Sequence, residues 1–218
     1  MMVRLIERYR FLVLFIILLC FFVIKAVDSE FNITELADYF LLSLMAFSLL
    51  VIGKKKKSFF LVLISIPAIV ELFLIYMSLY TSPEGVIAFK YGVASVYTLT
   101  MAVFCLYYTF KDKHIDITTL FGSLSAYLFI GLTFAYLYLA LASLNPNAFT
   151  GLAPNNENQA FYFSFIAMTT VGFGDIIPHG PIAQLISWLE AFTGQVYIAI
   201  ILSQLVGRYI AEHLKDKR

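Results

Sequence analysis

The sequence predicts an all-α integral membrane protein with six transmembrane helices. Of its 218 residues, 61% are hydrophobic and 13% are charged, which leaves too little charge to solvate the surface of a soluble domain. Six segments also approach the ~20 apolar residues that a helix needs to cross a bilayer. They lie at about 11–27, 36–52, 59–80, 86–110, 117–143 and 181–210. The formal net charge of +1 gives no indication of nucleic acid binding.

The basic residues mark one side of the membrane. They lie before the first span, between the second and third, between the fourth and fifth, and after the last, at Arg4, Arg8, Arg10, 54–57, Lys111, Lys113, Arg208, Lys215, Lys217 and Arg218. The intervening loops carry mostly acidic residues. The positive-inside rule therefore predicts cytoplasmic N- and C-termini. We expect a multi-pass protein of the plasma membrane, in contact with membrane lipids.

The first span has an alternative interpretation. A basic start followed by an apolar run from Phe11 to Ile24 is also typical of a cleaved signal peptide. The run continues almost to Val27 and lacks a small-x-small cleavage site, which favours a retained helix. Charge counting does not separate the two interpretations.

Residues 1–110 form a four-helix transmembrane module, and residues 111–218 form a two-helix unit with a long connection between its helices. The connection begins with Asn and Pro turns at 145–156, which exclude regular helix. An apolar stretch follows at 161–168, too short to span and suited to a re-entrant half-helix shielded by protein. Asn156 or Asn158 is a candidate N-cap. The negative C-terminal end of this half-helix would favour a cation.

Directly after the half-helix comes the sequence Thr169-Thr170-Val171-Gly172-Phe173-Gly174-Asp175. A potassium ion must shed its water to cross a narrow pore, and inward-pointing backbone carbonyls replace that water. Alternating glycines permit the backbone twist that this requires. With these flanking segments, residues from about 117 to 210 resemble the two-helix pore domain of the tetrameric potassium channel family, as a six-span bacterial-type member.

The resemblance implies a potassium-selective channel and not an enzyme. K+ is the permeant ion, with no other cofactor, and it is expected at the carbonyls of the filter residues Thr170, Val171, Gly172 and Phe173, with Gly174 completing the filter. The Thr170 hydroxyl adds the innermost ring. Phe173 stands where the family usually has tyrosine, so a hydroxyl that braces the filter from behind is lost. One chain supplies one strand of the filter, and the family closes it with four chains, which implies a homotetramer.

Asp175 follows the filter as in the family, where it braces the outer mouth and in several members contacts a carboxylate or tryptophan of the pore helix. The matching stretch here offers Tyr162, Ser164 and Ile166. The acidic partner is therefore absent, and filter stability or inactivation is expected to differ.

The last span carries residues that the family uses for gating. Gly194 lies where the inner helix of the family bends or packs closely, and the sequence leaves hinge and packing equally open. By analogy, the inner cavity is lined by Gln195, Ile198, Leu202 and Val206, which share a helical face. A hydrophobic gate that closes by dewetting is one interpretation of Leu202, Val206 and Ile210, and ordinary helix packing is the other.

Glu190 is a carboxylate deep within the last span. Because an intramembrane charge is costly, such a residue is a functional hypothesis by default. The favoured interpretation is a brace behind the filter, bonded to a hydroxyl of the half-helix such as that of Thr169. The alternative is a titratable site that senses pH or attracts cations.

The first four spans stand where a voltage sensor would lie. A sensor needs several basic residues along span four, and this span holds only Lys90 near its outer end. Conventional voltage gating is therefore not expected, and a structural ion pair between Lys90 and Glu71 is favoured. The residues after Ile210 are too few for an attached ligand-binding domain, although a separate partner subunit stays open.

Two other functions fit less well. A non-selective monovalent cation channel would change the second half of the filter, whereas Phe173-Gly174 is intact. A membrane enzyme would need convergent reactive side chains, and the two deep carboxylates, Glu71 and Glu190, lie in different modules. A transporter is expected to show internal symmetry or paired broken helices, and the sequence shows neither. The opening stimulus and the role of the first four spans are not readable from the sequence.

Overall fold

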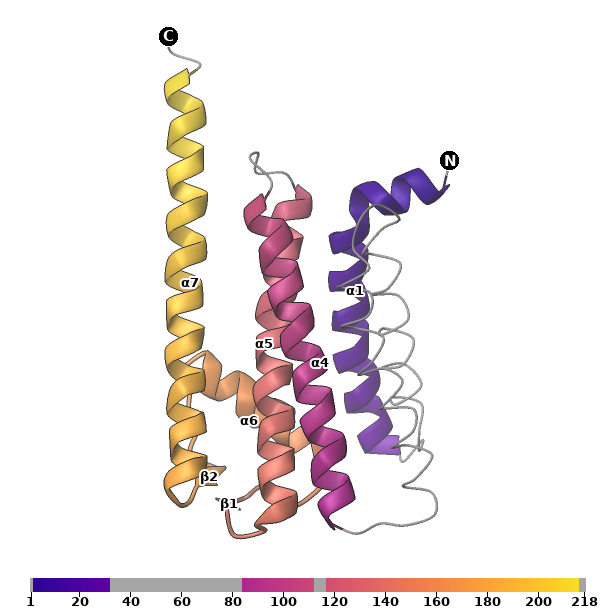
Figure 1. Ribbon diagram of the computed structural model, residues 1–218, viewed down its shortest axis with the longest axis vertical. Coiled ribbons are helices and arrows are strands. Elements are labelled where there is room, and N and C mark those ends of the chain that lie inside the picture. The colour runs from indigo at the N-terminus through magenta and orange to yellow at the C-terminus, as the bar shows by residue number, and fades with distance from the viewer. Residues whose placement is uncertain (1, 32–83, 112–116, 216–218) are drawn as a thin grey trace.

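The computed structural model describes residues 2–31, 84–111 and 117–215 (Figure 1). These residues form five helices and two short strands. In chain order they are α1 (Met2–Phe31), α4 (Glu84–Lys111), α5 (Ile117–Leu144), β1 (Phe149–Thr150), α6 (Glu157–Met168), β2 (Ile177–Pro178) and α7 (Pro181–Lys215). The expected spans at 36–52 and 59–80, and Glu71 with them, lie outside the described residues.

Within this described part, three helical segments are long and apolar enough to cross a membrane. They are Gly85–Phe110, Leu120–Leu144 and Pro181–Ile201, and a shorter apolar helix covers Phe11–Val27. The segments Gly85–Phe110, Leu120–Leu144 and Phe11–Val27 match the spans predicted at 86–110, 117–143 and 11–27 to within three residues at each end. The segment Pro181–Ile201 begins where the sixth span was predicted to begin and ends nine residues before the predicted end at 210. A mostly helical membrane architecture is therefore confirmed for these parts of the chain.

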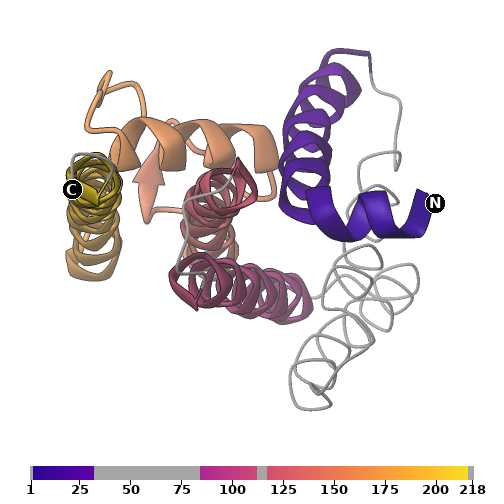
Figure 2. The same cartoon turned by 90° about the horizontal axis from the view of Figure 1, so that it is seen from above.

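Helix α5 lies at the centre and contacts each of the other four described helices. Figure 2 shows α4 on one side of it, α6 on the other, and α1 and α7 at opposite ends of α6. Polar side chains join α4 to α5 inside the apolar interface. Ser95 Oγ donates to the Thr133 carbonyl at 3.1 Å, and Thr133 Oγ1 donates to Thr98 Oγ1 at 3.0 Å. Such bonds hold helices together where lipid supplies no hydrophobic driving force.

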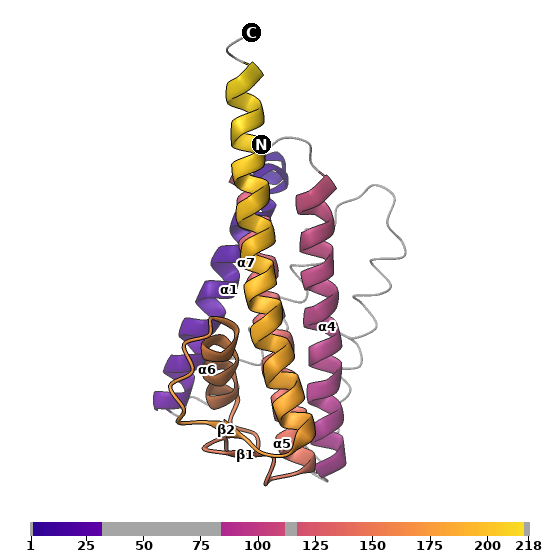
Figure 3. The same cartoon turned by 90° about the vertical axis from the view of Figure 1, so that its left-hand side faces the viewer.

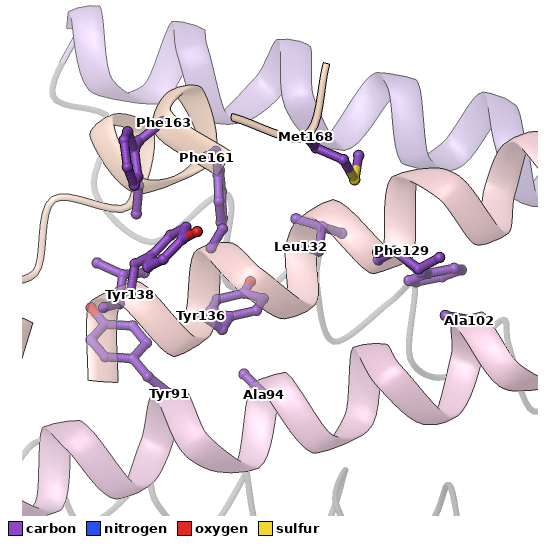
Figure 4. Packing of buried hydrophobic residues seen from close by; sticks show 14 of the residues in the cluster. Tyr91, Ala94, Ala102, Phe129, Leu132, Tyr136, Tyr138, Phe161, Phe163 and Met168 are labelled. Carbon is purple, nitrogen blue, oxygen red and sulfur yellow. The ribbon is translucent and has the colours of Figure 1, made fainter. Parts of the chain in front are cut away.

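The core beneath α6 is aromatic. Phe161 meets the ring of Tyr136 edge-on, with centroids 5.6 Å apart, and Phe163 lies 5.0 Å from the ring of Tyr138. Figure 4 shows these side chains of α6 directed at α5, with Met168 further along the same interface. The half-helix is therefore packed on protein, as its apolar sequence requires at membrane depth.

Helix α6 begins at Glu157, four residues before the apolar stretch predicted from the sequence. Asn156 is its N-cap, and the Asn156 side chain accepts a hydrogen bond from the Gln159 amide at 3.1 Å. The cap and the acidic first turn make these polar residues helical, which apolar periodicity alone does not indicate. The antiparallel pairing of β1 with β2 was also not predicted, because strands of two residues carry no periodic pattern.

Candidate functional site

The loop after α6 has an alternating backbone. Thr170, Gly172 and Gly174 have φ values of +59°, +54° and +79°. The two glycines occupy this region without a steric penalty, whereas a positive φ is uncommon for a β-branched residue such as threonine. The backbone twist predicted from the glycines is therefore present. It begins at Thr170, two residues before the first of the two glycines.

Backbone hydrogen bonds set the direction of the loop's carbonyls. The amides of Val171 and Gly172 both donate to the Ile166 carbonyl of α6, at 2.9 and 3.3 Å. No peptide bond among the described residues is cis, and in a trans peptide the carbonyl of one residue points opposite to the amide of the next. The carbonyls of Thr170 and Val171 therefore point away from α6, toward the open side of the loop.

The outer end of the loop is held by Tyr162. Its ring stacks on that of Phe173, with centroids 6.4 Å apart and an interplanar angle of 2°. A hydrogen bond with Asp175 raises the pKa of the Tyr162 phenol above its ordinary value. Phe173 lacks a hydroxyl, and α6 has no acid opposite Asp175, so Tyr162 supplies both the ring contact and the polar partner. The sequence analysis named Tyr162 among the residues of the half-helix that could lie opposite Asp175, but it did not predict the contacts of Tyr162 with Phe173 and Asp175.

The segment directly after β1 also packs against the outer end of this loop. Gly151 has a φ of +84°, and a Cβ built on it would lie 2.3 Å from the Asp175 carbonyl oxygen. The loop that carries β1 therefore approaches the backbone directly after the filter residues. Figure 3 shows α6 and the two strands gathered near the end of α7 that lies opposite the C-terminus.

Glu190 is fully buried and joins three helices. Its two carboxyl oxygens form hydrogen bonds with the Tyr138 hydroxyl of α5 and with Ser164 Oγ of α6, the latter at 2.5 Å. The sequence suggested a hydroxyl of the half-helix such as that of Thr169. The partner is a hydroxyl of this helix, but it is that of Ser164, because Thr169 Oγ1 donates to the Phe165 carbonyl at 2.6 Å. Ser164 lies further back along α6, on the side that faces α5 and α7.

The hydroxyl of Ser164 has only one proton, and two oxygens lie within its reach. Ser164 Oγ is 2.7 Å from the Gly131 carbonyl as well as 2.5 Å from Glu190. An ionised carboxylate would leave one of these two contacts without a proton, since a hydroxyl donates once. A protonated Glu190 donates to Ser164, which then donates to Gly131, while Tyr138 donates to the other carboxyl oxygen. This arrangement satisfies every contact and favours a neutral brace.

Gly194 packs against the end of α6. A Cβ at this position would lie 2.1 Å from the Met168 carbonyl oxygen and 2.7 Å from its Cγ. The backbone of α6 thus occupies the space that a side chain would need. This contact favours the packing interpretation of Gly194, and a hinge at this residue stays a prediction.

The structure describes the side chains of some of the remaining site residues but not of others. Gln195 Nε2 lies 3.4 Å from Thr170 Oγ1, so it reaches the innermost filter hydroxyl, and the Ile198 side chain is 47% exposed on the same helix. Lys90 lies over the Tyr91 ring of its own helix, 5.9 Å from the centroid. The side chains of Leu202, Val206 and Ile210 lie outside the described residues, and the gate stays a prediction.

Comparisons with known proteins find similarity over part of the chain. Residues 123–211 match the family model described as an ion channel. The chain is 36% identical over 83 residues to the inward rectifier potassium channel Kirbac3.1 of Paramagnetospirillum magnetotacticum, covering 38% of this chain and 27% of that channel. Residues 123–211 are thus similar to the pore region of ion channels, and the relative just named is a potassium channel.

The chain has further relatives among plant channels. It is 27% identical over 105 residues to two-pore potassium channel 4 of Arabidopsis thaliana, covering 46% of this chain and 37% of the relative. It is 37% identical over 95 residues to two pore potassium channel c of Oryza sativa, covering 42% and 19%. The chain thus matches well under half the length of these relatives, which are ion channels and not enzymes. No solved structure matches it.

Replacing Glu190 tests the neutral brace. Glu190→Gln keeps a donor for Ser164 and an acceptor for Tyr138, so we expect an assembly about as heat-stable as the wild type. Glu190→Ala removes the acceptor of the buried Tyr138 hydroxyl, whereas Ser164 keeps the Gly131 carbonyl, and the change should cost about 1–3 kcal/mol. The measurement is the temperature at which the detergent-solubilised assembly unfolds. A Gln variant as unstable as the Ala variant would show that an ionised carboxylate is required.

Gly194→Ala should destabilise the pore domain by roughly 1–3 kcal/mol, because the added methyl group overlaps the Met168 backbone and α6 or α7 must shift. Gly207→Ala is the matched control on the same helix, since a Cβ there meets no atom within 4 Å. Thermal unfolding in detergent compares the two. Equal stabilities would contradict the close packing of Gly194 against Met168.

Tyr162→Phe should speed the loss of current during prolonged opening, since it removes the partner of Asp175 while keeping the ring on Phe173. The wild-type bond needs the phenolic proton, so its contribution is complete below the ordinary pKa of 10.0 and is lost only as pH rises through the raised pKa. Patch recordings at neutral and strongly alkaline pH measure both effects. A variant that inactivates like the wild type at neutral pH would leave Tyr162 without this role.

Proposed function

We propose that the chain forms a homotetrameric, potassium-selective channel that conducts K+ passively across the plasma membrane. The observation that carries the proposal is the filter backbone, with positive φ at Thr170, Gly172 and Gly174 and amides donated to α6. In this conformation the carbonyls of Thr170 and Val171 face one side, and those of Gly172 and Phe173 would continue the row. Such a row of oxygens replaces the hydration shell of K+.

The exposed surfaces of a single chain support the tetramer. Only 11% of the α7 span is buried, against 61% of the α5 span, although both are apolar. The Phe173 side chain is 70% exposed beside the filter. Large apolar side chains recur at helical spacing along α7 and are open in one chain, at Leu185, Trp188, Phe192 and Val196. Three further copies around a fourfold axis would cover these surfaces and close the ring of carbonyls.

The direction of α6 supports a cation-conducting pore. Its N-terminal end lies toward α1 and its C-terminal end lies against Gly194 of α7, directly before the filter. The partial negative charge of that end would act on an ion in the cavity below the filter. Asp175 adds negative charge at the outer mouth.

The arrangement of the helices is compatible with cytoplasmic termini. In Figure 1 the start of α1 and the end of α7 lie at the same end of the molecule, and the strands lie at the opposite end. We propose that the filter opens outward and that the last turns of α7 line the cytoplasmic entrance. Residues 1–110 would form a four-helix module that does not act as a conventional voltage sensor, because span four lacks the repeated basic residues.

The decisive experiment is a reversal potential in a planar bilayer. With a potassium gradient and sodium replacing potassium on one side, the wild-type current should reverse near the potassium equilibrium potential. Gly172→Ala is the control, because a Cβ there meets no atom within 4 Å of its own chain and acts only through the strained φ of +54°. We expect that variant to assemble and to lose selectivity.

A wild-type current that reverses near zero would contradict potassium selectivity and establish a non-selective cation channel instead. Absence of any current at every pH and voltage tested, from protein that is assembled in the membrane, would contradict the channel function itself.

A further inference from the structure

The first turn of α6 is tied to α1. Lys25 Nζ of α1 lies 2.5 Å from Glu157 Oε2 of α6, and the Asn158 side chain donates to the Lys25 carbonyl at 3.2 Å. The two charged side chains are 13% and 15% exposed. Because both lie mostly out of water, their attraction is screened less than that of a surface pair.

An aromatic contact extends this attachment along α6. The Phe22 ring of α1 meets Phe161 edge-on, with centroids 6.2 Å apart, and Phe165 edge-on at 5.2 Å. Phe21 adds a contact with Phe161 at 5.9 Å. Helix α1 therefore holds α6 from its first turn to the residue directly before Ile166, whose carbonyl receives two filter amides.

The other attachments of α6 come from the pore domain itself. Ser164 is bonded to Glu190 of α7 and to Gly131 of α5, and Met168 packs on Gly194. With 12 residues, α6 is a rigid rod about 18 Å long. A displacement of its first turn would therefore be carried to the filter at its other end. Figure 2 shows α6 reaching from α1 to α7.

We propose that Lys25 is a positioning residue for the filter, through which α1 sets the conducting conformation of the pore helix. The four-helix module would then act on the filter end of the channel as well as on any inner gate. The proposal rests on the proposed function. It gives α1 a role that the match over residues 123–211 does not include.

A double-mutant cycle tests this coupling. Lys25→Gln and Glu157→Gln are recorded singly and together in bilayers, with the mean open time and the loss of current at low potassium as readouts. Each single change should shorten the open time on the order of tenfold, since it leaves a mostly buried charge without its partner. The double variant should fall no further than the single ones. Lys25→Arg should retain wild-type behaviour.

The matched control is Lys25→Arg, which changes the side chain at the same position but keeps its positive charge. Asn158→Ala is a milder second variant that removes only the bond to the Lys25 carbonyl, and it should shorten the open time in the same direction. The amount of assembled protein and its unfolding temperature are measured beside the currents, since a purely structural role would lower these and leave the open time of the surviving channels unchanged.

Additive effects in the cycle, or a Lys25→Gln channel that gates like Lys25→Arg, would overturn the proposal. The reversal potential of the wild type, taken in the same bilayers, keeps the two hypotheses apart. A reversal near zero would contradict potassium selectivity, whereas the comparison of open times would still decide the role of Lys25.

Discussion

The hydrogen bonds from the amides of Val171 and Gly172 to the Ile166 carbonyl are the constraint on which the rest of the site depends. These two bonds fix the direction in which the carbonyls of Thr170 and Val171 face. Because the acceptor belongs to α6, that direction is defined only if α6 is held in place. The protein meets that requirement with one contact on each part of the helix: an ion pair at its start, Ser164 at its middle and Met168 at its end. The ion pair joins α6 to α1, Ser164 joins it to α5 and α7, and Met168 packs one turn further along α7.

These attachments use polar groups in an environment where they are expensive. A buried carboxyl such as that of Glu190 costs free energy in a membrane unless its hydrogen bonds are complete. Here Tyr138, Ser164 and Gly131 complete them, so the polar cluster fixes the relative position of α5, α6 and α7 where apolar contacts alone would allow sliding. Close backbone packing at Gly194 fixes the same helices without any polar group.

The sequence predicted the described spans, the half-helix, an asparagine cap at Asn156 or Asn158 and the backbone twist of the following loop, because these features depend on local composition and on a short motif. It did not predict the partner of Glu190, since helical spacing along α7 gives a face but not the residue of α6 that meets it. The contacts of Tyr162 and Lys25 were missed for a similar reason. Each joins residues that are distant in the chain, and no pattern within one helix contains that information.

The left-handed backbone of Thr170 has a consequence for how the proposed filter depends on its ion. A β-branched residue at a φ of +59° is strained, and the strain persists only while its surroundings over-determine the conformation. An ion held by the neighbouring carbonyls would supply part of that determination, so emptying the filter would let the threonine relax toward an ordinary backbone. The permeant ion would then act as a ligand of the folded state, and its concentration would set how long the pore keeps its shape.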